Sequence, residues 1–205
     1  MPLPPRLLLI TDSLARPDLE TVVTRALTGA PFDLLLRDKT APDALVTTLA
    51  RRLKPLLHAA GGRLLIHDRV DVALTVQADG LHLPEAARST EEVRKLVGPR
   101  PILGRSCHDP ENARKHLLQG GDYVTLSPVF ITESHPESLP LGLERFSAMR
   151  AAIPGPVLAL GGIHDGNIRD VLTTGATGVA LIRGIFQAND PAEAAYRLYL
   201  HIQNG

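Results

Sequence analysis

The sequence is organised as short apolar runs that recur about every 25 residues, each followed by a longer segment of helical periodicity. Several runs are continuous Leu, Ile and Val rather than alternating apolar and polar residues. Continuous runs are typical of strands buried on both faces of a parallel sheet. Eight runs are expected to be strands: Arg6–Thr11, Phe32–Arg37, Arg63–His67, Asp79–Leu83, Pro101–Arg105, Asp122–Ser127, Pro156–Leu160 and Gly178–Ile182.

The segments between these runs begin as helices do. Ser89 precedes Glu92 by three residues, which is the spacing of a capping box. Asp109–Pro110 and Asp190–Pro191 each place a capping carboxylate before a proline at the first helical position. The expected helices are Leu19–Leu27, Ala41–Ala60, Val70–Gln77, Thr90–Val97, Glu111–Gln119, Leu143–Ala152, Gly166–Thr174 and Ala192–Ile202.

Eight strand-then-helix units in a row predict an α/β fold, a single (β/α)8 TIM barrel closed by right-handed crossovers. The main competitor is an open doubly wound sheet, whose first strand-to-helix turn carries a glycine-rich phosphate fingerprint. Here that turn is Thr11–Leu14, which contains no glycine. No linker or low-complexity tract divides the chain, so residues 1–205 are expected to form one domain.

The composition excludes several classes of function. Lys plus Arg and Asp plus Glu number 22 each, so no net positive charge favours a polyanion. Aromatic residues are 3% of the chain and there is no Trp, which argues against stacking platforms for single strands. No apolar stretch approaches the roughly 18 residues of a membrane span, and one cysteine suits a reducing compartment. We therefore expect a cytoplasmic protein that binds neither nucleic acid nor membrane, and the sequence leaves a homodimer open.

The ends of the last two strands carry the clearest local signal. In barrels of this type the active site lies at the carboxyl ends of the strands, and phosphate is commonly held by the loops after strands 7 and 8. Gly161, Gly162 and Gly184 allow a phosphate to approach the backbone, and Arg183 adds a charged donor. The alternative is that these glycines only form tight turns.

Side chains at the other strand ends suggest an anionic substrate and proton transfer. Arg37 and Lys39 alternate along the end of one strand, so both are expected to face the barrel mouth unless they form an exposed loop cluster. Asp68 is a candidate metal ligand, or else a helix cap or ion-pair partner of Arg69. His67 and His135 lead the candidates for proton transfer among the five histidines at strand ends and loops: His67, His82, His108, His135 and His164.

Seven segments follow one another along nearly the whole chain: Leu34–Lys39, Ile66–Ala73, Ala78–Leu83, Gly104–His108, Gly121–Val124 with Ser127–Phe130, Leu158–Ile163 and Gly178–Leu181. In order and in spacing they resemble the thiamine phosphate synthase superfamily. The resemblance implies a TIM barrel of thiamin biosynthesis that takes a small phosphorylated thiazole. One branch of the superfamily joins a hydroxymethylpyrimidine diphosphate to a thiazole phosphate with Mg²⁺ and releases diphosphate. The other, thiazole tautomerase, aromatises a thiazole carboxylate phosphate without a metal.

The chain departs from the pattern of both branches. Compared with the synthase branch, Leu35 replaces a pyrimidine-binding Gln, His67 replaces an Asn, and Ala87 replaces a second Mg²⁺ carboxylate, for which only Glu85 could substitute. The loop that carries two threonines and a lysine in synthases has Thr132, Ser134 and His135 here. In the tautomerase branch the proton-shuttling His falls where this chain has Pro128.

These departures lead us to expect a protein closer to the tautomerase-like branch. In that interpretation no cofactor is required, His67 or His135 transfers the proton, and Ser106, Thr132 and Ser134 help Arg37 and Lys39 hold the substrate. The alternatives are a synthase whose Mg²⁺ is bound by Asp68 and Glu85, and a catalytically inactive barrel that only binds a phosphorylated ligand.

Overall fold

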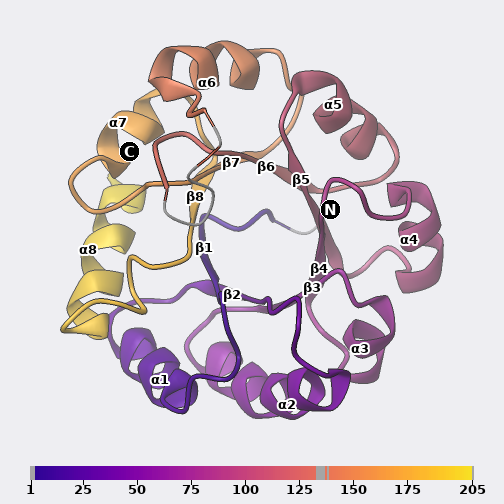
Figure 1. The fold of residues 1–205 in the computed structure, drawn as a ribbon, viewed down its shortest axis with the longest axis vertical. Helices are drawn as coiled ribbons and strands as arrows, with labels where there is room; N and C mark the ends of the chain where they lie inside the picture. The colour runs from indigo at the N-terminus through magenta and orange to yellow at the C-terminus, as the bar shows by residue number, and fades with distance from the viewer. Residues whose placement is uncertain (1–2, 133–136, 138, 205) are drawn as a thin grey trace.

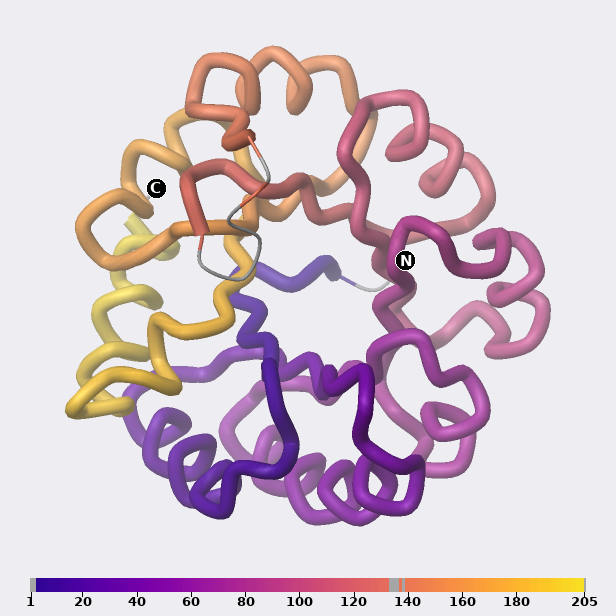
Figure 2. Tube along the Cα trace, in the orientation of Figure 1, coloured from indigo at the N-terminus to yellow at the C-terminus, as the bar shows by residue number. Residues whose placement is uncertain are grey.

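The eight strands form one closed parallel barrel in the order β1 to β8, with β1 hydrogen-bonded to β8 (Figure 1). The computed structural model describes residues 3–132, 137 and 139–204. The tube in Figure 2 follows the chain once around the barrel, with each helix outside the strands. The predicted (β/α)8 fold is confirmed. The strands are β1 (Leu7–Ile10), β2 (Asp33–Leu36), β3 (Leu64–His67), β4 (Gly80–Leu83), β5 (Ile102–Cys107), β6 (Tyr123–Leu126), β7 (Val157–Leu160) and β8 (Gly178–Leu181).

The helices lie close to their predicted positions. Ser89 and Glu92 form the expected capping box, and the Asp109 and Asp190 carboxylates accept hydrogen bonds from the first backbone N–H groups of their helices. None of the helices in the described part of the chain has the length and apolar character needed to cross a bilayer. The helices are α1 (Leu19–Gly29), α2 (Asp43–Ala59), α3 (Val70–Thr75), α4 (Thr90–Val97), α5 (Pro110–Leu118), α6 (Gly142–Ala151), α7 (Ile168–Thr173) and α8 (Pro191–Gln203).

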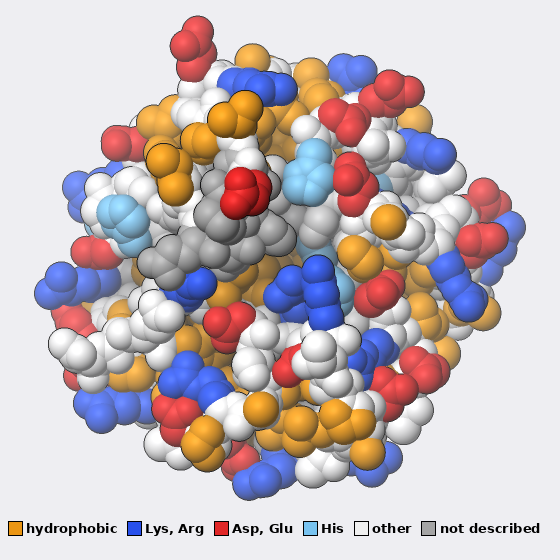
Figure 3. All heavy atoms as spheres, in the orientation of Figure 1, with side chains coloured by type: hydrophobic (Ala, Val, Ile, Leu, Met, Phe, Trp, Pro, Cys, Tyr) orange, Lys and Arg blue, Asp and Glu red, His pale blue; other side chains and the backbone are white. Residues whose placement is uncertain are grey.

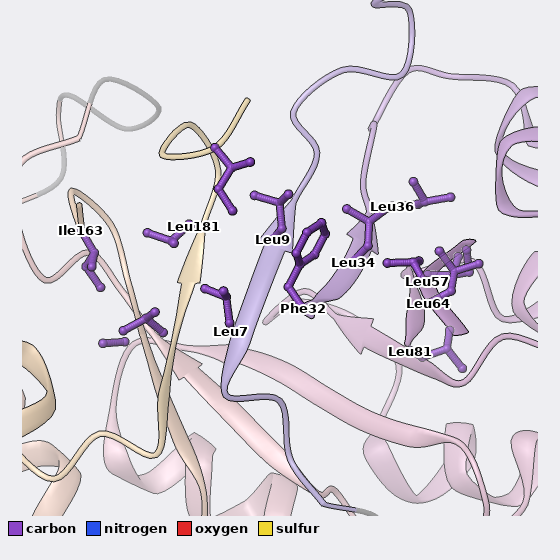
Figure 4. Close-up of a cluster of buried hydrophobic side chains, with 14 of the residues drawn as sticks. Leu7, Leu9, Phe32, Leu34, Leu36, Leu57, Leu64, Leu81, Ile163 and Leu181 are labelled. Carbon is purple, nitrogen blue, oxygen red and sulfur yellow. The ribbon is translucent and has the colours of Figure 1, made fainter. Parts of the chain in front are cut away.

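Burial on both faces explains the continuous apolar runs. In β1, Leu7 and Leu9 belong to the large core between strands and helices, whereas Leu8 and Ile10 belong to a second core inside the barrel. Figure 4 shows part of this outer core, in which Leu7 and Leu9 of β1 lie near Phe32. Since successive side chains of a strand alternate between faces, each strand must be apolar at nearly every position.

The barrel interior becomes more polar towards both ends. Asp33 lies two residues before the inward-facing Leu35, and its carboxylate pairs with Arg63 at 2.6 Å near the amino ends of the strands. Tyr123 is fully buried in the middle, beneath Gly104, where an added Cβ would come within 2.2 Å of the tyrosine ring. The apolar middle therefore forms a floor, above which the carboxyl ends of the strands carry the candidate site.

Candidate active site

A central cavity of about 300 Å³ opens at the carboxyl ends of the strands. Its lining brings together side chains from four consecutive strand ends: Arg37 and Lys39 after β2, His67 of β3, His82 of β4 and Ser106 of β5. In the face shown by Figure 3, Lys, Arg and His side chains gather near the centre. The cavity wall further includes Leu35, Glu85, His108, Ser127, Pro128 and Thr132.

The two cations at the end of β2 are held by local hydrogen bonds. The Thr11 hydroxyl donates to the Arg37 carbonyl at 2.8 Å and accepts from the Arg37 N–H at 2.7 Å. The Asp38 carboxylate accepts from the backbone N–H groups of Leu14, Thr40 and Ala41, and these donors lower its pKa to about 2. Because Asp38 is occupied in this way, the half-buried Arg37 and the exposed Lys39 can present their charge to an anion in the cavity.

His67 lies in the cavity as a neutral imidazole. Burial, and then the nearby charges of Arg37, Lys39 and Arg69, lower the pKa of His67 to about 4. A group with this pKa is a weak base, and at neutral pH almost none of it is the imidazolium that acts as a general acid. His67 is therefore better suited to hydrogen bonding than to the proton transfer expected from the sequence, and that role stays a prediction. His135 and Ser134 lie outside the described residues.

The described residues do not make a protein-built magnesium site. Glu85 is the carboxylate of the central cavity, and it faces His108 at 3.8 Å. Asp68 lines a different hollow, together with Arg69 and residues of α3 and α4. Nowhere in the described part of the chain do three His, Cys, Asp or Glu side chains gather as metal ligands. Since Mg²⁺ prefers several oxygen ligands at near-octahedral geometry, Asp68 as a metal ligand stays a prediction.

A second cavity, of about 860 Å³, lies at the carboxyl ends of β7 and β8. Gly161 and Gly162 have positive φ angles of 103° and 66°. A Cβ on Gly162 would lie 2.6 Å from the Ile131 carbonyl oxygen, so only glycine fits this close approach. Asn167 holds the same loop, because its amide donates to the Gly162 carbonyl at 3.0 Å and accepts from the His164 N–H at 2.8 Å.

Arg183 and Gly184 line the same cavity from the end of β8. A turn that starts here is closed by a hydrogen bond from the Gln187 N–H to the Arg183 carbonyl at 3.0 Å. An added Cβ at Gly184 would make only ordinary contacts, the nearest at 3.8 Å to Leu181. The four predicted phosphate-binding residues are thus brought together, but only Gly161 and Gly162 are required to be glycine by their surroundings. That they bind a phosphate stays a prediction.

The two cavities adjoin along a common wall. Thr132, Leu160, Gly161 and Ile182 line both of them. The central cavity carries charged and polar side chains on an otherwise apolar wall, and the other cavity is bounded by glycine-rich loops. The arrangement can hold two molecules next to each other, with one anionic group at either end.

Two inward-facing residues were not given a role from the sequence. His82 was only one of five histidines at strand ends and loops, yet it lies across from His67 in the strand register and lines the central cavity. Tyr123 hydrogen-bonds to it from below at 3.0 Å. Gly104 inside a strand was the available signal, because an internal strand glycine often marks a close approach of another group. Cys107 is buried, and burial raises the pKa of its thiol to about 12, so it is an unreactive thiol.

The fold and the paired cavities define a (β/α)8 barrel with two adjoining cavities at the carboxyl ends of its strands, and comparisons with known proteins specify the family. Residues 7–185 match the family model described as thiamine monophosphate synthase. The chain is 41% identical over 182 residues to a putative thiamine-phosphate synthase of Geobacter sulfurreducens, covering 88% of this chain and 85% of the relative. It is 39% identical to a thiamine-phosphate synthase of Moorella thermoacetica, covering 89% and 87%.

A solved structure agrees with the sequence relatives. Thiamine phosphate pyrophosphorylase from Pyrococcus furiosus superposes with a TM-score of 0.86 at 31% identity, over 97% of this chain and 96% of that one. A 3-hexulose-6-phosphate synthase, at 15% identity and a TM-score of 0.76, shares the fold alone. The chain belongs to the thiamine monophosphate synthase family of thiamine-biosynthesis barrel enzymes. The expected closer kinship with the tautomerase branch is not supported, since these relatives carry the synthase name.

Proposed function

We propose that this protein is a thiamine-phosphate synthase, which joins a hydroxymethylpyrimidine diphosphate to a small thiazole phosphate and releases diphosphate. The observation that carries the proposal is the pair of adjoining cavities. A transferase must hold two substrates with their reacting atoms in contact, whereas an isomerase needs one site only. The names of relatives at 39% to 41% identity support the same reaction.

Each of the two cavities suits one of the two substrates. The thiazole phosphate takes the glycine-rich cavity, with its phosphate on the backbone at Gly161 and Gly162. The pyrimidine diphosphate takes the central cavity, with its diphosphate towards Arg37 and Lys39. The thiazole nitrogen then faces the pyrimidine methylene carbon at the place where the two cavities adjoin.

In the reaction a C–N bond forms between the thiazole nitrogen and the methylene carbon, and the C–O bond to the diphosphate breaks. The electron pair of the C–O bond leaves with the diphosphate, which gains charge in the transition state. Arg37 and Lys39 stabilise that charge by hydrogen bonds and electrostatic attraction. Leu35 meets the pyrimidine with an apolar surface, where the synthase pattern has a hydrogen-bonding Gln.

A two-substrate assay tests the proposal. Purified protein is mixed with hydroxymethylpyrimidine diphosphate and thiazole phosphate, and released diphosphate and thiamine phosphate are both measured. The expected result is one diphosphate per thiamine phosphate, with none released when either substrate is omitted. The assay is run with Mg²⁺ and with EDTA, since the described residues offer no complete metal site. Binding of both substrates without any product would contradict the proposal and favour an inactive binding barrel.

One observation favours a second candidate, thiazole tautomerase. Asp68 and Glu85 line separate cavities, and the described residues hold no cluster of three His, Cys, Asp or Glu side chains, whereas aromatisation of a thiazole needs no leaving group. Incubation with the thiazole carboxylate phosphate tautomer separates the two functions. Metal-independent conversion to the aromatic product, without diphosphate release in the first assay, would establish the tautomerase instead.

A further inference from the structure

A chain of hydrogen bonds runs from the barrel interior up to the central cavity. The Tyr123 hydroxyl lies 3.0 Å from Nδ1 of His82, and Nε2 of the same imidazole lies 3.0 Å from the Ser106 hydroxyl. Tyr123 has no exposed surface and His82 is 2% exposed, whereas Ser106 is half-buried and faces the cavity. The three residues come from neighbouring strands, β6, β4 and β5.

The buried Tyr123 hydroxyl determines which group donates and which accepts in these hydrogen bonds. Within the described residues, Nδ1 of His82 is the hydrogen-bond partner of the Tyr123 hydroxyl, and burial raises the pKa of that phenol well above its ordinary value. The phenol keeps its proton, and a buried O–H group needs an acceptor. Nδ1 must therefore accept, and it cannot carry a proton itself.

The position of the imidazole proton in turn determines the hydrogen bond between His82 and Ser106. Burial lowers the pKa of His82 well below its ordinary value, so the ring is neutral and has a single proton, which must lie on Nε2. Nε2–H then donates to Ser106. The serine hydroxyl accepts this bond and keeps its own proton for another partner. Thr125, opposite Ser106 in the strand register, has a buried hydroxyl without a partner in the described part of the chain, so it does not take that proton.

We propose that Tyr123 and His82 are positioning residues that fix Ser106 as a hydrogen-bond donor to the diphosphate group bound in the central cavity. Arg37 and Lys39 face the same space, so the acceptor is an anion. The identity of this ligand rests on the proposed function. The direction of the hydrogen-bond chain does not, because it follows from the protein alone.

The first test measures the tautomer of His82 without any ligand. Protein labelled with ¹⁵N in its histidines is examined by NMR at pH 7, and the His82 signals are assigned by their loss in His82→Gln. The expected result is a neutral ring protonated on Nε2, with Nδ1 showing the shift of a hydrogen-bonded acceptor. A ring protonated on Nδ1, or an imidazolium, would overturn the proposal whatever the protein catalyses.

The second test measures coupling between Tyr123 and Ser106. Inorganic diphosphate is titrated by calorimetry into the wild type, Tyr123→Phe, Ser106→Ala and the double variant. Each single variant is expected to bind about tenfold more weakly, and the double variant no more weakly than Ser106→Ala alone. Tyr199→Phe, in the half-buried part of α8, is the matched control and should bind as the wild type does.

Additive effects in the double variant would overturn the proposal, because they would mean that Tyr123 does not act through Ser106. If Tyr123→Phe does not fold, the tautomer measurement on the wild type still decides. Failure of the proposed function gives a different result. In that case the tautomer and the coupling are as expected, but the two-substrate assay releases no diphosphate.

Discussion

The glycine-rich cavity and the central cavity differ in the groups that they offer to an anion. The first relies on backbone at Gly161 and Gly162, in conformations that other residues rarely adopt. The second relies on side chains that project from β2 to β5. Leu35 and His67, two of the departures from the synthase pattern, lie on the wall of the central cavity, where one substitution changes the chemistry without changing the fold. Gly161 and Gly162 keep the pattern, and their positive φ angles and close contacts admit no other residue. The loop after β6, whose Thr132 lines both cavities, departs from the pattern as well.

Removing a cation from the central cavity should have the largest effect. Arg37→Ala is expected to lower kcat/KM for the pyrimidine diphosphate by about a hundredfold to a thousandfold, because charge on the departing diphosphate loses its stabilisation. KM for the thiazole phosphate should change little. The measurement is steady-state kinetics with each substrate varied in turn. Arg51→Ala, which removes an equal charge from an exposed position of α2, is the control, and an equal loss there would show that only net charge matters.

A side chain added at Gly162, in the glycine-rich cavity, should have a smaller effect. It should act on the thiazole phosphate instead of the pyrimidine diphosphate. Gly162→Ala is expected to raise KM for the thiazole phosphate about tenfold to a hundredfold, because the new Cβ collides with the Ile131 carbonyl. Gly61→Ala is the matched control. Gly61 also has a positive φ, of 84°, but an added Cβ there meets nothing within 4 Å. Both variants carry the cost of a side chain at a positive φ, about 1 to 2 kcal/mol, so an equal change in KM would mean that backbone strain, not the cavity, is responsible.

Lowering the pH should destabilise the folded protein, because His67 in the central cavity is held unprotonated there. Burial and the nearby cations lower the pKa of His67 from 6.5, its value in the unfolded chain, to about 4 in the folded protein. Between these values the unfolded chain holds more protons, so the free energy of unfolding falls as the pH falls, by up to about 2 kcal/mol at pH 5 for this residue. Urea unfolding at pH 7 and pH 5 should show a smaller loss in His67→Gln than in the wild type. An equal loss in both proteins would mean that His67 is not held neutral by its surroundings.

The smallest effect is expected at Asp68. Its φ of 62° lies in the left-handed region, which Asn also adopts, so Asp68→Asn removes the charge and keeps the backbone. Because Asp68 lines a hollow apart from the central cavity, activity should change less than about threefold, the size of a surface substitution. The Mg²⁺ dependence of the rate is measured in parallel. A loss above a hundredfold with a raised Mg²⁺ requirement would establish Asp68 as a metal ligand.

The sequence predicted the position of the glycine-rich cavity better than the side chains that meet in the central cavity. Strand ends and glycine pairs are local signals, so the barrel and the place of Gly161 and Gly162 could be read from spacing alone. The direction in which a side chain faces depends on register, which is set by neighbouring strands. His82 and Tyr123 therefore had no visible role in the sequence, and the separation of Asp68 from Glu85 could not be foreseen.

Simultaneous binding of two anions tests the central claim most directly. Inorganic diphosphate is titrated by calorimetry into protein alone and into protein saturated with thiazole phosphate. If the adjoining cavities are separate sites, diphosphate binds with equal or higher affinity when thiazole phosphate is present, and Arg37→Ala weakens only the diphosphate. If the thiazole phosphate displaces diphosphate competitively, the two ligands share one site and the two-cavity mechanism is wrong.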